Sequence, residues 1–329
     1  MSKSMGLKSR IKGKLKRIFK ICTGCTILYK TNWYKNFFVD TEHENYPDNY
    51  WYRKHDERNF DVVNLGSSGG KWAFDYYETG LKGMNWAYQP QTLYEDYQLL
   101  RHYHSILKKK GVVIITIMPF TGLNKKTGLF DALKYMKLET QGEPIQPYMA
   151  KEALRFAEYP ILFKKPAVKA LIKYFIGKDK PRDYSTQNAD YNKMTNDQLV
   201  TDAAMWINGW KHQFNIIDFD APLTEENQKG RDYRIKLMRE LIDFCSERDY
   251  KPVYVIPPVT KYLDRYFTPK FKQTYYYDFL KQVDREILLL DYSADKSLMD
   301  SDLYFNSFFF NKRGRKIFTQ RVLRDIGLV

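Results

Sequence analysis

The chain has 329 residues, of which 43% are hydrophobic and 28% charged, and it carries a formal net charge of +15 at pH 7. This balance is typical of a globular protein with a sizeable core and excludes a disordered chain. The mean hydropathy is −0.59, and no apolar run approaches the ~20 residues that a spanning helix needs, which argues against a transmembrane protein.

The first 22 residues form a basic segment with helical periodicity. Eight lysines and arginines and no acid fall within the first twenty residues. Apolar residues recur there at spacings of three and four: Leu7, Ile11, Leu15, Ile18 and Cys22. The spacing predicts a helix with one apolar face. Such a helix can lie in the plane of an anionic membrane surface. The alternative is a disordered basic leader. No zinc-finger, RNA-recognition or helix-turn-helix signature supports nucleic-acid binding, so a nucleic-acid partner is not expected.

The chain has three cysteines, Cys22, Cys25 and Cys245, too few for a disulfide framework. A zinc site at Cys22-x-x-Cys25 would need two further ligands, and His43 and His55 lack the paired spacing of such a site. We therefore predict no metal and no other cofactor, and we assign Cys245 to the core.

Strand and helix patterns alternate after an aromatic lead-in that ends at residue 59. Strands are predicted over 60–66, 83–88, 112–119, 251–258 and 287–293. Helices are predicted over 91–109, from Thr224 to about Cys245, over 274–284 and over 312–325. Near-continuous apolar runs suit parallel strands that are covered on both faces. The sequence thus predicts an α/β fold, a three-layer α/β/α sandwich with a five-stranded parallel sheet.

We predict two parts of the chain. Residues 1–59 form the basic leader and lead-in, and residues 60–329 form one α/β domain with a helical insertion at about 125–222. The insertion is rich in basic residues: Lys164, Lys165, Lys169, Lys173, Lys178, Lys180 and Arg182. Such a cluster is either a solvated face or a surface for an anionic polymer.

Short motifs stand at the carboxyl ends of the predicted strands, where sites of such folds lie. They are NLGSS (64–68), NWAYQPQTL (85–93), VIPPV (255–259) and YFNSFFFNKRG (304–314). In this order they resemble the SGNH (GDSL-like) hydrolase superfamily, and in particular the D-alanyl-lipoteichoic acid biosynthesis protein branch. The resemblance covers about 60–125 and 223–329, and it implies a flavodoxin-like sandwich that acts on acyl esters of cell-surface polymers.

The family uses a serine nucleophile and an Asp-x-x-His pair from the final loop. The resemblance places the nucleophile on Ser68, with Ser67 where the family has aspartate. The Asp-x-x-His pair falls on Asn306 and Phe309, so both the acid and the base are replaced. A serine hydroxyl needs an adjacent base, and a phenyl ring accepts no proton, so a conventional triad is absent.

Other residues would complete such a site. The resemblance points to four substrate-binding candidates: Ser67, Asn85, Gly122 and Asn124. The family's second-block glycine falls on Pro90, which has no N–H to donate. Among the histidines, His212 in the insertion is the one that might fold over the site as a substitute base, and a solvated or packing histidine is the alternative.

The motif residues also have structural interpretations. Ser67 and Ser68 are ordinary turn residues that cap a helix or hold an anion through backbone amides. Phe308, Phe309 and Phe310 either fill the space that an imidazole would take or form a floor on which a sugar stacks.

We therefore expect a degenerate, non-catalytic binding or scaffolding member of the superfamily in bacterial cell-surface polysaccharide assembly or modification. The alternative is an active O-acyltransferase or esterase that uses Ser68 with a base from outside the usual loop, so enzymatic activity is left open. The expected partners are a cell-surface polysaccharide or acylated carbohydrate, and an anionic membrane surface that binds residues 1–22. No convincing signal peptide is present, so we place the protein at the cytoplasmic face of the membrane, with the extracytoplasmic side as the alternative.

Overall fold

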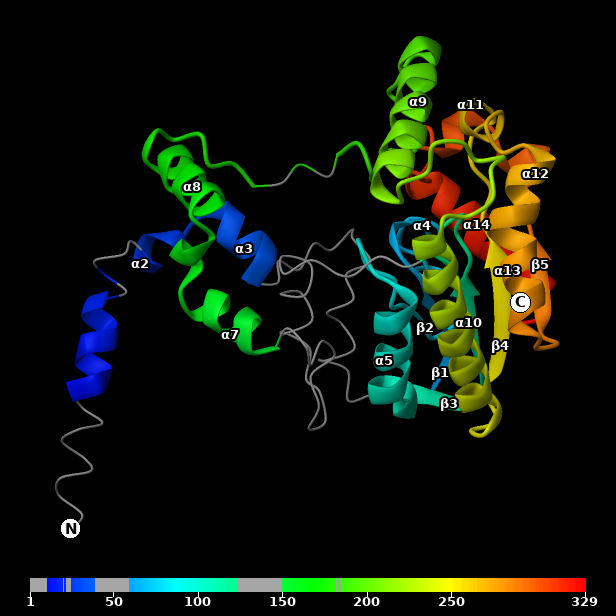
Figure 1. The fold of residues 1–329 in the computed structure, drawn as a ribbon, viewed down its shortest axis with the longest axis horizontal. Helices are drawn as coiled ribbons and strands as arrows, with labels where there is room; N and C mark the ends of the chain where they lie inside the picture. The colour runs from blue at the N-terminus through cyan, green and yellow to red at the C-terminus, as the bar shows by residue number, and fades with distance from the viewer. Residues whose placement is uncertain are drawn as a thin grey trace. The chain divides into compact units, whose positions relative to one another are not determined.

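The computed structural model describes residues 11–19, 21, 25–38, 59–123, 150–181, 183 and 185–329. The chain forms two compact units by its internal contacts (Figure 1). Unit 1 comprises Met1–His43 and Gly128–Asp183, and unit 2 comprises Glu44–Thr127 and Tyr184–Val329. The segment predicted as one insertion is thus shared: its first part groups with the N-terminal segment, and its second part groups with the sheet.

The helices of unit 1 are residues 11–19, α2 (Cys25–Leu28), α3 (Asn32–Phe38), α7 (Ala150–Glu158), η3 (Pro160–Phe163) and α8 (Lys165–Phe175). Helix 11–19 confirms the predicted helix over that stretch, and residues 1–10, 20 and 22 of the leader lie outside the described residues. Asn32 joins the two segments of the unit: its backbone N–H donates to Asp179 Oδ2, and its Nδ2 donates to the Asp179 carbonyl, each at 2.8 Å.

The sheet of unit 2 consists of β1 (Phe60–Leu65), β2 (Gly83–Asn85), β3 (Leu107–Thr116), β4 (Lys251–Ile256) and β5 (Leu288–Asp291). All neighbouring strands are parallel, in the order β2-β1-β3-β4-β5. The α/β class and the five-stranded parallel sheet are therefore confirmed, and the strand order is that of flavodoxin-like folds.

The other elements of unit 2 are α4 (Ser68–Lys71), α5 (Leu93–Tyr103), η2 (His104–Ile106), α9 (Asn196–Gln213), α10 (Glu225–Ser246), α11 (Lys261–Asp264), α12 (Pro269–Lys272), η4 (Gln273–Tyr277), α13 (Asp278–Val283), η5 (Lys296–Leu298), η6 (Ser301–Leu303) and α14 (Lys312–Asp325). None of the described helices is both long and apolar enough to cross a membrane.

Both faces of the sheet are covered, as the apolar strands require. On one face, Val62, Ile114 and Val253 from three successive strands pack with Phe318 and Val322 of α14. On the other face, α10 contacts both α5 and α13, and the three helices form the second helical layer (Figure 1). The result is a three-layer sandwich whose core is dominated by β-branched and aromatic side chains.

Local signals located two helices of this sandwich well. Thr224 is the N-cap of α10, and its hydroxyl accepts a hydrogen bond from Asn227 N at 3.3 Å. Cys245, near the end of the same helix, is a buried free thiol, and burial raises its pKa to about 12. The last helix, α14, has the predicted bounds, and Asn311 caps it by accepting from Gly314 N at 2.9 Å.

The predicted helix over 91–109 is too long, because its last residues belong to the sheet. The helix ends at Tyr103, and β3 begins at Leu107, which pairs with Phe60 of β1. Lys108 then donates to Asp61 Oδ1 at 2.5 Å. Strand pairing therefore overrides the helical periodicity of this segment.

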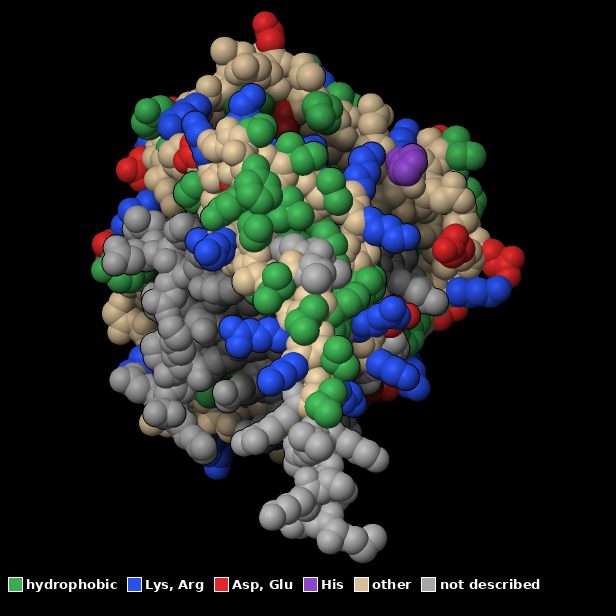
Figure 2. Space-filling view, turned by 90° about the vertical axis from the view of Figure 1, so that its left-hand side faces the viewer, with side chains coloured by type: hydrophobic (Ala, Val, Ile, Leu, Met, Phe, Trp, Pro, Cys, Tyr) green, Lys and Arg blue, Asp and Glu red, His purple; other side chains and the backbone are tan. Residues whose placement is uncertain are grey.

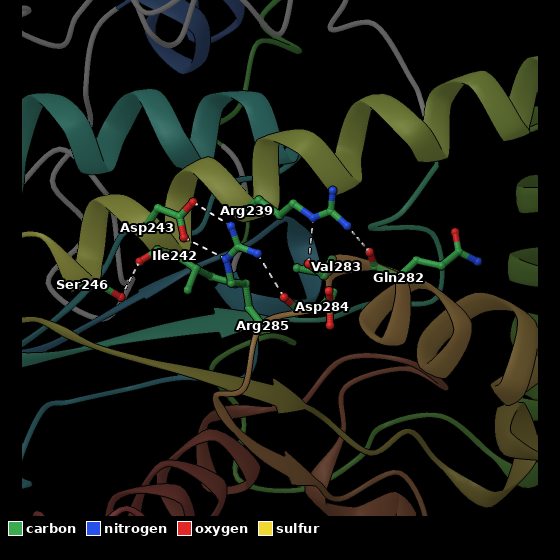
Figure 3. A network of polar contacts seen from close by, with 8 residues as sticks. All are labelled: Arg239, Ile242, Asp243, Ser246, Gln282, Val283, Asp284 and Arg285. Carbon is green, nitrogen blue, oxygen red and sulfur yellow. Dashed lines mark hydrogen bonds and ion pairs between the residues drawn. The ribbon is translucent and has the colours of Figure 1, made fainter.

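A polar network fastens the end of α13 to α10 (Figure 3). Arg239 donates hydrogen bonds to the carbonyls of Gln282 and Val283, at 2.7 and 2.8 Å. These carbonyls are at the end of α13, where the helix itself provides no hydrogen-bond donor for them. Arg285 binds both carboxylate oxygens of Asp243 at 2.8 and 2.9 Å, and this hydrogen-bonded pairing lowers the pKa of Asp243.

Candidate active site

The serine turn follows β1 directly, at the carboxyl edge of the sheet. Gly66 has a φ of 133°, and a Cβ built on it would lie 2.9 Å from Thr116 Cβ, so only glycine fits the turn. Ser67 occupies the N-cap position of α4, and Ser68 is its first residue. Since β1 lies between β2 and β3, the turn stands at the point where the strand order reverses, the usual ligand site of an open α/β sheet.

The hydroxyl of Ser68 makes no hydrogen bond within the described part of the chain. His102 bonds the Gln98 carbonyl through Nδ1 at 2.6 Å, and His104 bonds the Tyr250 hydroxyl through Nδ1 at 3.1 Å. His212 is exposed on the last turn of α9 and has no hydrogen bond to Ser68. Of the three histidines that the structure describes, none is therefore placed as a base for this serine; His43 and His55 lie outside the described residues.

The loop from Asn306 to Phe309, where the sequence predicts a replaced acid and base, is held by hydrogen bonds within the loop and to other elements. Asn306 Oδ1 accepts from the backbone N–H groups of Phe308 and Phe309, at 2.9 and 2.7 Å. Asp202 of α9 accepts from the N–H and the hydroxyl of Ser307, at 2.9 and 2.5 Å. Thr260 donates to the Ser307 carbonyl at 2.6 Å. Asn306 thus closes a turn, and its neighbours fix that turn against two other elements.

The three phenylalanines of this loop are packing residues. Phe309 is 4% exposed, and its ring centroid lies 5.3 Å from that of Trp206 and 6.5 Å from that of Trp72. Phe308 contacts Trp206 and Trp210, each at 5.1 Å. Phe310 is buried as well, in the core under α14. These ring faces are covered by other rings and are not offered to a sugar.

Asn85 holds α4 in place. Its Nδ2 donates to the carbonyls of Gly70, Lys71 and Phe74, at 3.3, 3.1 and 3.1 Å. Its Oδ1 accepts from Asn64 Nδ2 at 2.8 Å and from Ala87 N at 3.0 Å. The amide predicted to face a substrate is therefore used to terminate α4 and to bind it to β1 and β2.

The other three predicted substrate-binding residues, Ser67, Gly122 and Asn124, differ in their surroundings. Ser67 Oγ accepts from Gln91 N at 3.3 Å, so it fastens the segment after β2 to the serine turn. Gly122 is buried, and a Cβ there would lie 2.7 Å from Phe279 Cγ, so close packing against α13 explains this glycine. Asn124 lies outside the described residues.

Asp96 is a site residue that the sequence analysis missed. Its Oδ1 accepts from Gly66 N at 2.8 Å and from Gln91 Nε2 at 2.6 Å, so a buried carboxyl group holds the serine turn. Burial raises the pKa of Asp96 to about 7, against the lowering effect of these two hydrogen bonds. In the sequence this residue appears only as an acid in the first turn of α5, where the helix dipole accounts for it.

Lys71 is a second residue that was missed, and here a signal existed. It follows Ser68 at the Ser-x-x-Lys spacing, which puts the two residues on one side of α4. Lys71 is 6% exposed, and its Nζ lies 4.4 Å from the ring centroid of Tyr88. An ionisable side chain is thus buried one helical turn from the serine.

Fold and site together define an open α/β protein with a serine-bearing turn at its switch point and an aromatic loop that contacts Trp72 at the end of α4. No group of His, Cys, Asp and Glu among the described residues has the arrangement of a metal site. The sequence matches no known protein-family model, and the curated proteins contain no significant match to it.

We expect Asp96→Asn to remove a pH dependence of stability. A carboxyl whose pKa is about 7 in the folded chain and 3.8 in the unfolded chain binds its proton more tightly when folded. The free energy of unfolding of the wild type should therefore fall as pH rises from about 4 to about 7, with an upper bound of about 4 kcal/mol. An asparagine Oδ1 can still accept both hydrogen bonds, so urea unfolding of the variant should show this fall removed.

The matched control is Asp243→Asn, because the carboxylate of Asp243 is paired at the surface and its pKa is lowered. This control should keep the fall in stability between about pH 4 and pH 7. An equal fall in the Asp96→Asn variant and the wild type would show that Asp96 does not titrate as its burial implies.

Phe309→Ala should destabilise unit 2 by on the order of 3 kcal/mol, because it empties a ring-sized space between Trp72 and Trp206. Urea unfolding measures the loss. Tyr77→Ala is the control, since this ring is 73% exposed and its removal should change stability by no more than about 0.5 kcal/mol. A loss below about 1 kcal/mol for Phe309→Ala would contradict the packing role.

Proposed function

We propose that the protein is a degenerate, non-catalytic SGNH-hydrolase-like protein that serves as a binding or scaffolding component of bacterial cell-surface polysaccharide assembly or modification. The motif resemblance and the flavodoxin-like strand order support the class. The observation that carries the proposal is the loop from Asn306 to Phe309, in which an amide closes a turn and a buried phenyl ring replaces the base.

The physical reason is the weakness of serine as a nucleophile. An unassisted hydroxyl keeps its proton at neutral pH, and loss of the base in a triad lowers the rate by several powers of ten. Phe309 accepts no proton, and its ring is packed against Trp206, which belongs to a different segment of the chain.

Side chains around the same sheet edge suit an anionic carbohydrate. On and after α11, Lys261 Nζ lies 5.2 Å from the ring centroid of Tyr262, and Arg265 Cζ lies 4.8 Å from that of Tyr266. Both basic residues are exposed. Ring faces pack against the apolar faces of sugars, and the cations next to them would pair with acidic substituents. The expected partner is thus an anionic cell-surface polysaccharide or acylated carbohydrate.

The leader helix supports a peripheral place at a membrane. Within residues 11–19, Ile11, Leu15 and Ile18 are exposed on one side, while lysines and Arg17 occupy the others. An apolar stripe with basic flanks binds the interface of an anionic bilayer.

A second candidate function is an active O-acyltransferase or esterase with Ser68 as the nucleophile. The observation in its favour is Lys71, which is buried at the Ser-x-x-Lys spacing from Ser68, an arrangement in which a lysine can serve as the base for a serine.

Labelling with a fluorophosphonate serine probe separates the two functions. We expect no labelling of the wild type above the level of Ser68→Ala, because the described part of the chain places no histidine at the serine. The controls are an active serine esterase and a heat-denatured sample. Labelling that Ser68→Ala abolishes would overturn the non-catalytic proposal, and its further loss in a folded Lys71→Met variant would identify the base.

The binding role predicts a specific loss in the double variant Lys261→Ala/Arg265→Ala. Its affinity for a poly(glycerol phosphate) polymer, measured by calorimetry, should fall about fivefold or more, because two exposed ionic contacts disappear. Affinity for a neutral glucan should change less. Lys229→Ala/Lys236→Ala removes two exposed charges from α10 and is the matched control. Equal losses in the two double variants would show that only net charge matters.

A further inference from the structure

The outward face of α8 in unit 1 is apolar and exposed. Val168, Ile172 and Phe175 lie on it, with Ile172 55% exposed and Phe175 67% exposed, and Ile176, also exposed, follows at the C-cap. Successive residues of a helix turn by about 100°, so these four side chains fall within an arc about 100° wide. Such a stripe is as wide as the face that a helix normally buries against a core.

This stripe is separate from the face that α8 uses for folding. Ala167 and Ala170 are buried against Leu28, and Trp33 and Leu171 pack at the edge of that small core. The apolar side chains of the outward face are therefore surplus to the packing of unit 1, and leaving them in water is unfavourable.

A basic row runs along the outward stripe. Lys165, Lys169 and Lys173 follow one another at spacings of four, and all three are exposed. Lys169 and Lys173 lie on one flank of the apolar arc, whereas Lys165, the first residue of α8, falls within it. From Glu158 to Asp179 the chain contains no acidic residue. Long lysine side chains at this position can keep their ammonium groups at headgroup level while the apolar residues go deeper.

We propose that α8 is a membrane-binding helix that lies in the plane of an anionic lipid surface. The charge complementarity favours anionic headgroups, and the apolar stripe favours a bilayer over a soluble polyanion, which would need only the lysines. The proposal extends the membrane part of the proposed function to a second helix, and it does not rest on the sheet-edge site. Within unit 1, helix 11–19 is joined to the end of α7, because Lys16 forms an ion pair with Glu158 and the Phe19 ring contacts Tyr159 at 5.5 Å.

Figure 2 shows a surface of this kind. A band of hydrophobic side chains runs down the described part of the face, with Lys and Arg side chains on both sides of it. Helix 11–19 has the same composition, and both helices belong to one compact unit. Two such segments strengthen binding because the second engages its surface without a new loss of translational freedom.

The test is co-sedimentation of the full chain with vesicles of phosphatidylcholine alone and of phosphatidylcholine mixed with phosphatidylglycerol. We expect binding to the mixed vesicles and a loss of about tenfold or more in Ile172→Glu/Phe175→Glu. Lys169→Gln/Lys173→Gln should lose about tenfold on mixed vesicles and nothing on neutral ones. Hydrogen exchange of residues 165–177 should slow when mixed vesicles are added. Circular dichroism checks that each variant is folded.

Met205→Glu/Ile217→Glu is the matched control, because it places two charges on exposed apolar positions of unit 2 and should not change vesicle binding. Ile11→Glu/Leu15→Glu tests the leader separately. If only the leader variant loses binding, the α8 proposal is wrong and the proposed membrane role stands. If the wild type does not bind mixed vesicles, both fail.

Two further outcomes would also overturn the α8 proposal. In the first, Lys169→Gln/Lys173→Gln loses binding to soluble polyphosphate, and Ile172→Glu/Phe175→Glu still binds vesicles as the wild type does. This pair of results would indicate a site for a soluble polyanion. The other is a wild-type dimer in light scattering that Ile172→Glu/Phe175→Glu converts to a monomer, which would assign the stripe to a second copy of the chain.

Discussion

The structure of unit 2 depends on one constraint: a parallel sheet of apolar strands must be covered on both faces. Val62 and Val63 of β1 point to opposite faces, and both are fully buried. Helices therefore occupy both sides, and the polar chemistry is confined to the edge where strands give way to turns. Gly66, Ser67 and Ser68 lie there, and so do the loops that follow β4 and precede α14.

At that edge the loop before α14 is packed against aromatic side chains of other segments. In the superfamily that we propose for this chain, a histidine from the last loop faces the serine, whereas here Phe309 contacts Trp72 and Trp206. The hydrogen bonds of the loop agree with this, since Asn306 and Asp202 saturate its backbone and the Ser307 hydroxyl. The same contacts that stabilise the edge thus explain why we assign a binding role.

In unit 1, by contrast, large apolar side chains are exposed and the core is small. Its described core is small, built on Leu28, Ala167 and Ala170, while several large apolar side chains of helix 11–19 and of α8 are exposed. Alanines on the inner face let helices approach closely but bury little area, so this unit gains less from its own packing than unit 2 does. The membrane surface that we propose as the partner of unit 1 would bury these exposed apolar side chains, which the small core of the unit does not cover.

The sequence by itself determined the features that follow from local spacing. Apolar runs located the five strands, Thr224 marked the start of one helix, and the last helix was placed at residues 312–325. These features could be predicted because strand period, capping and residue chemistry act over a few residues.

Only the tertiary structure decided the rest. The segment from Leu107 belongs to the sheet because Leu107 pairs with Phe60. Asn85 holds α4 through hydrogen bonds to its carbonyls, and Asp96 accepts a hydrogen bond from the backbone N–H of Gly66 in the serine turn. The partner of the Phe309 ring, Trp206, lies about a hundred positions away in a segment with no recognisable motif. Such contacts depend on how the chain returns to the same sheet edge, and no pattern of neighbouring residues carries that information.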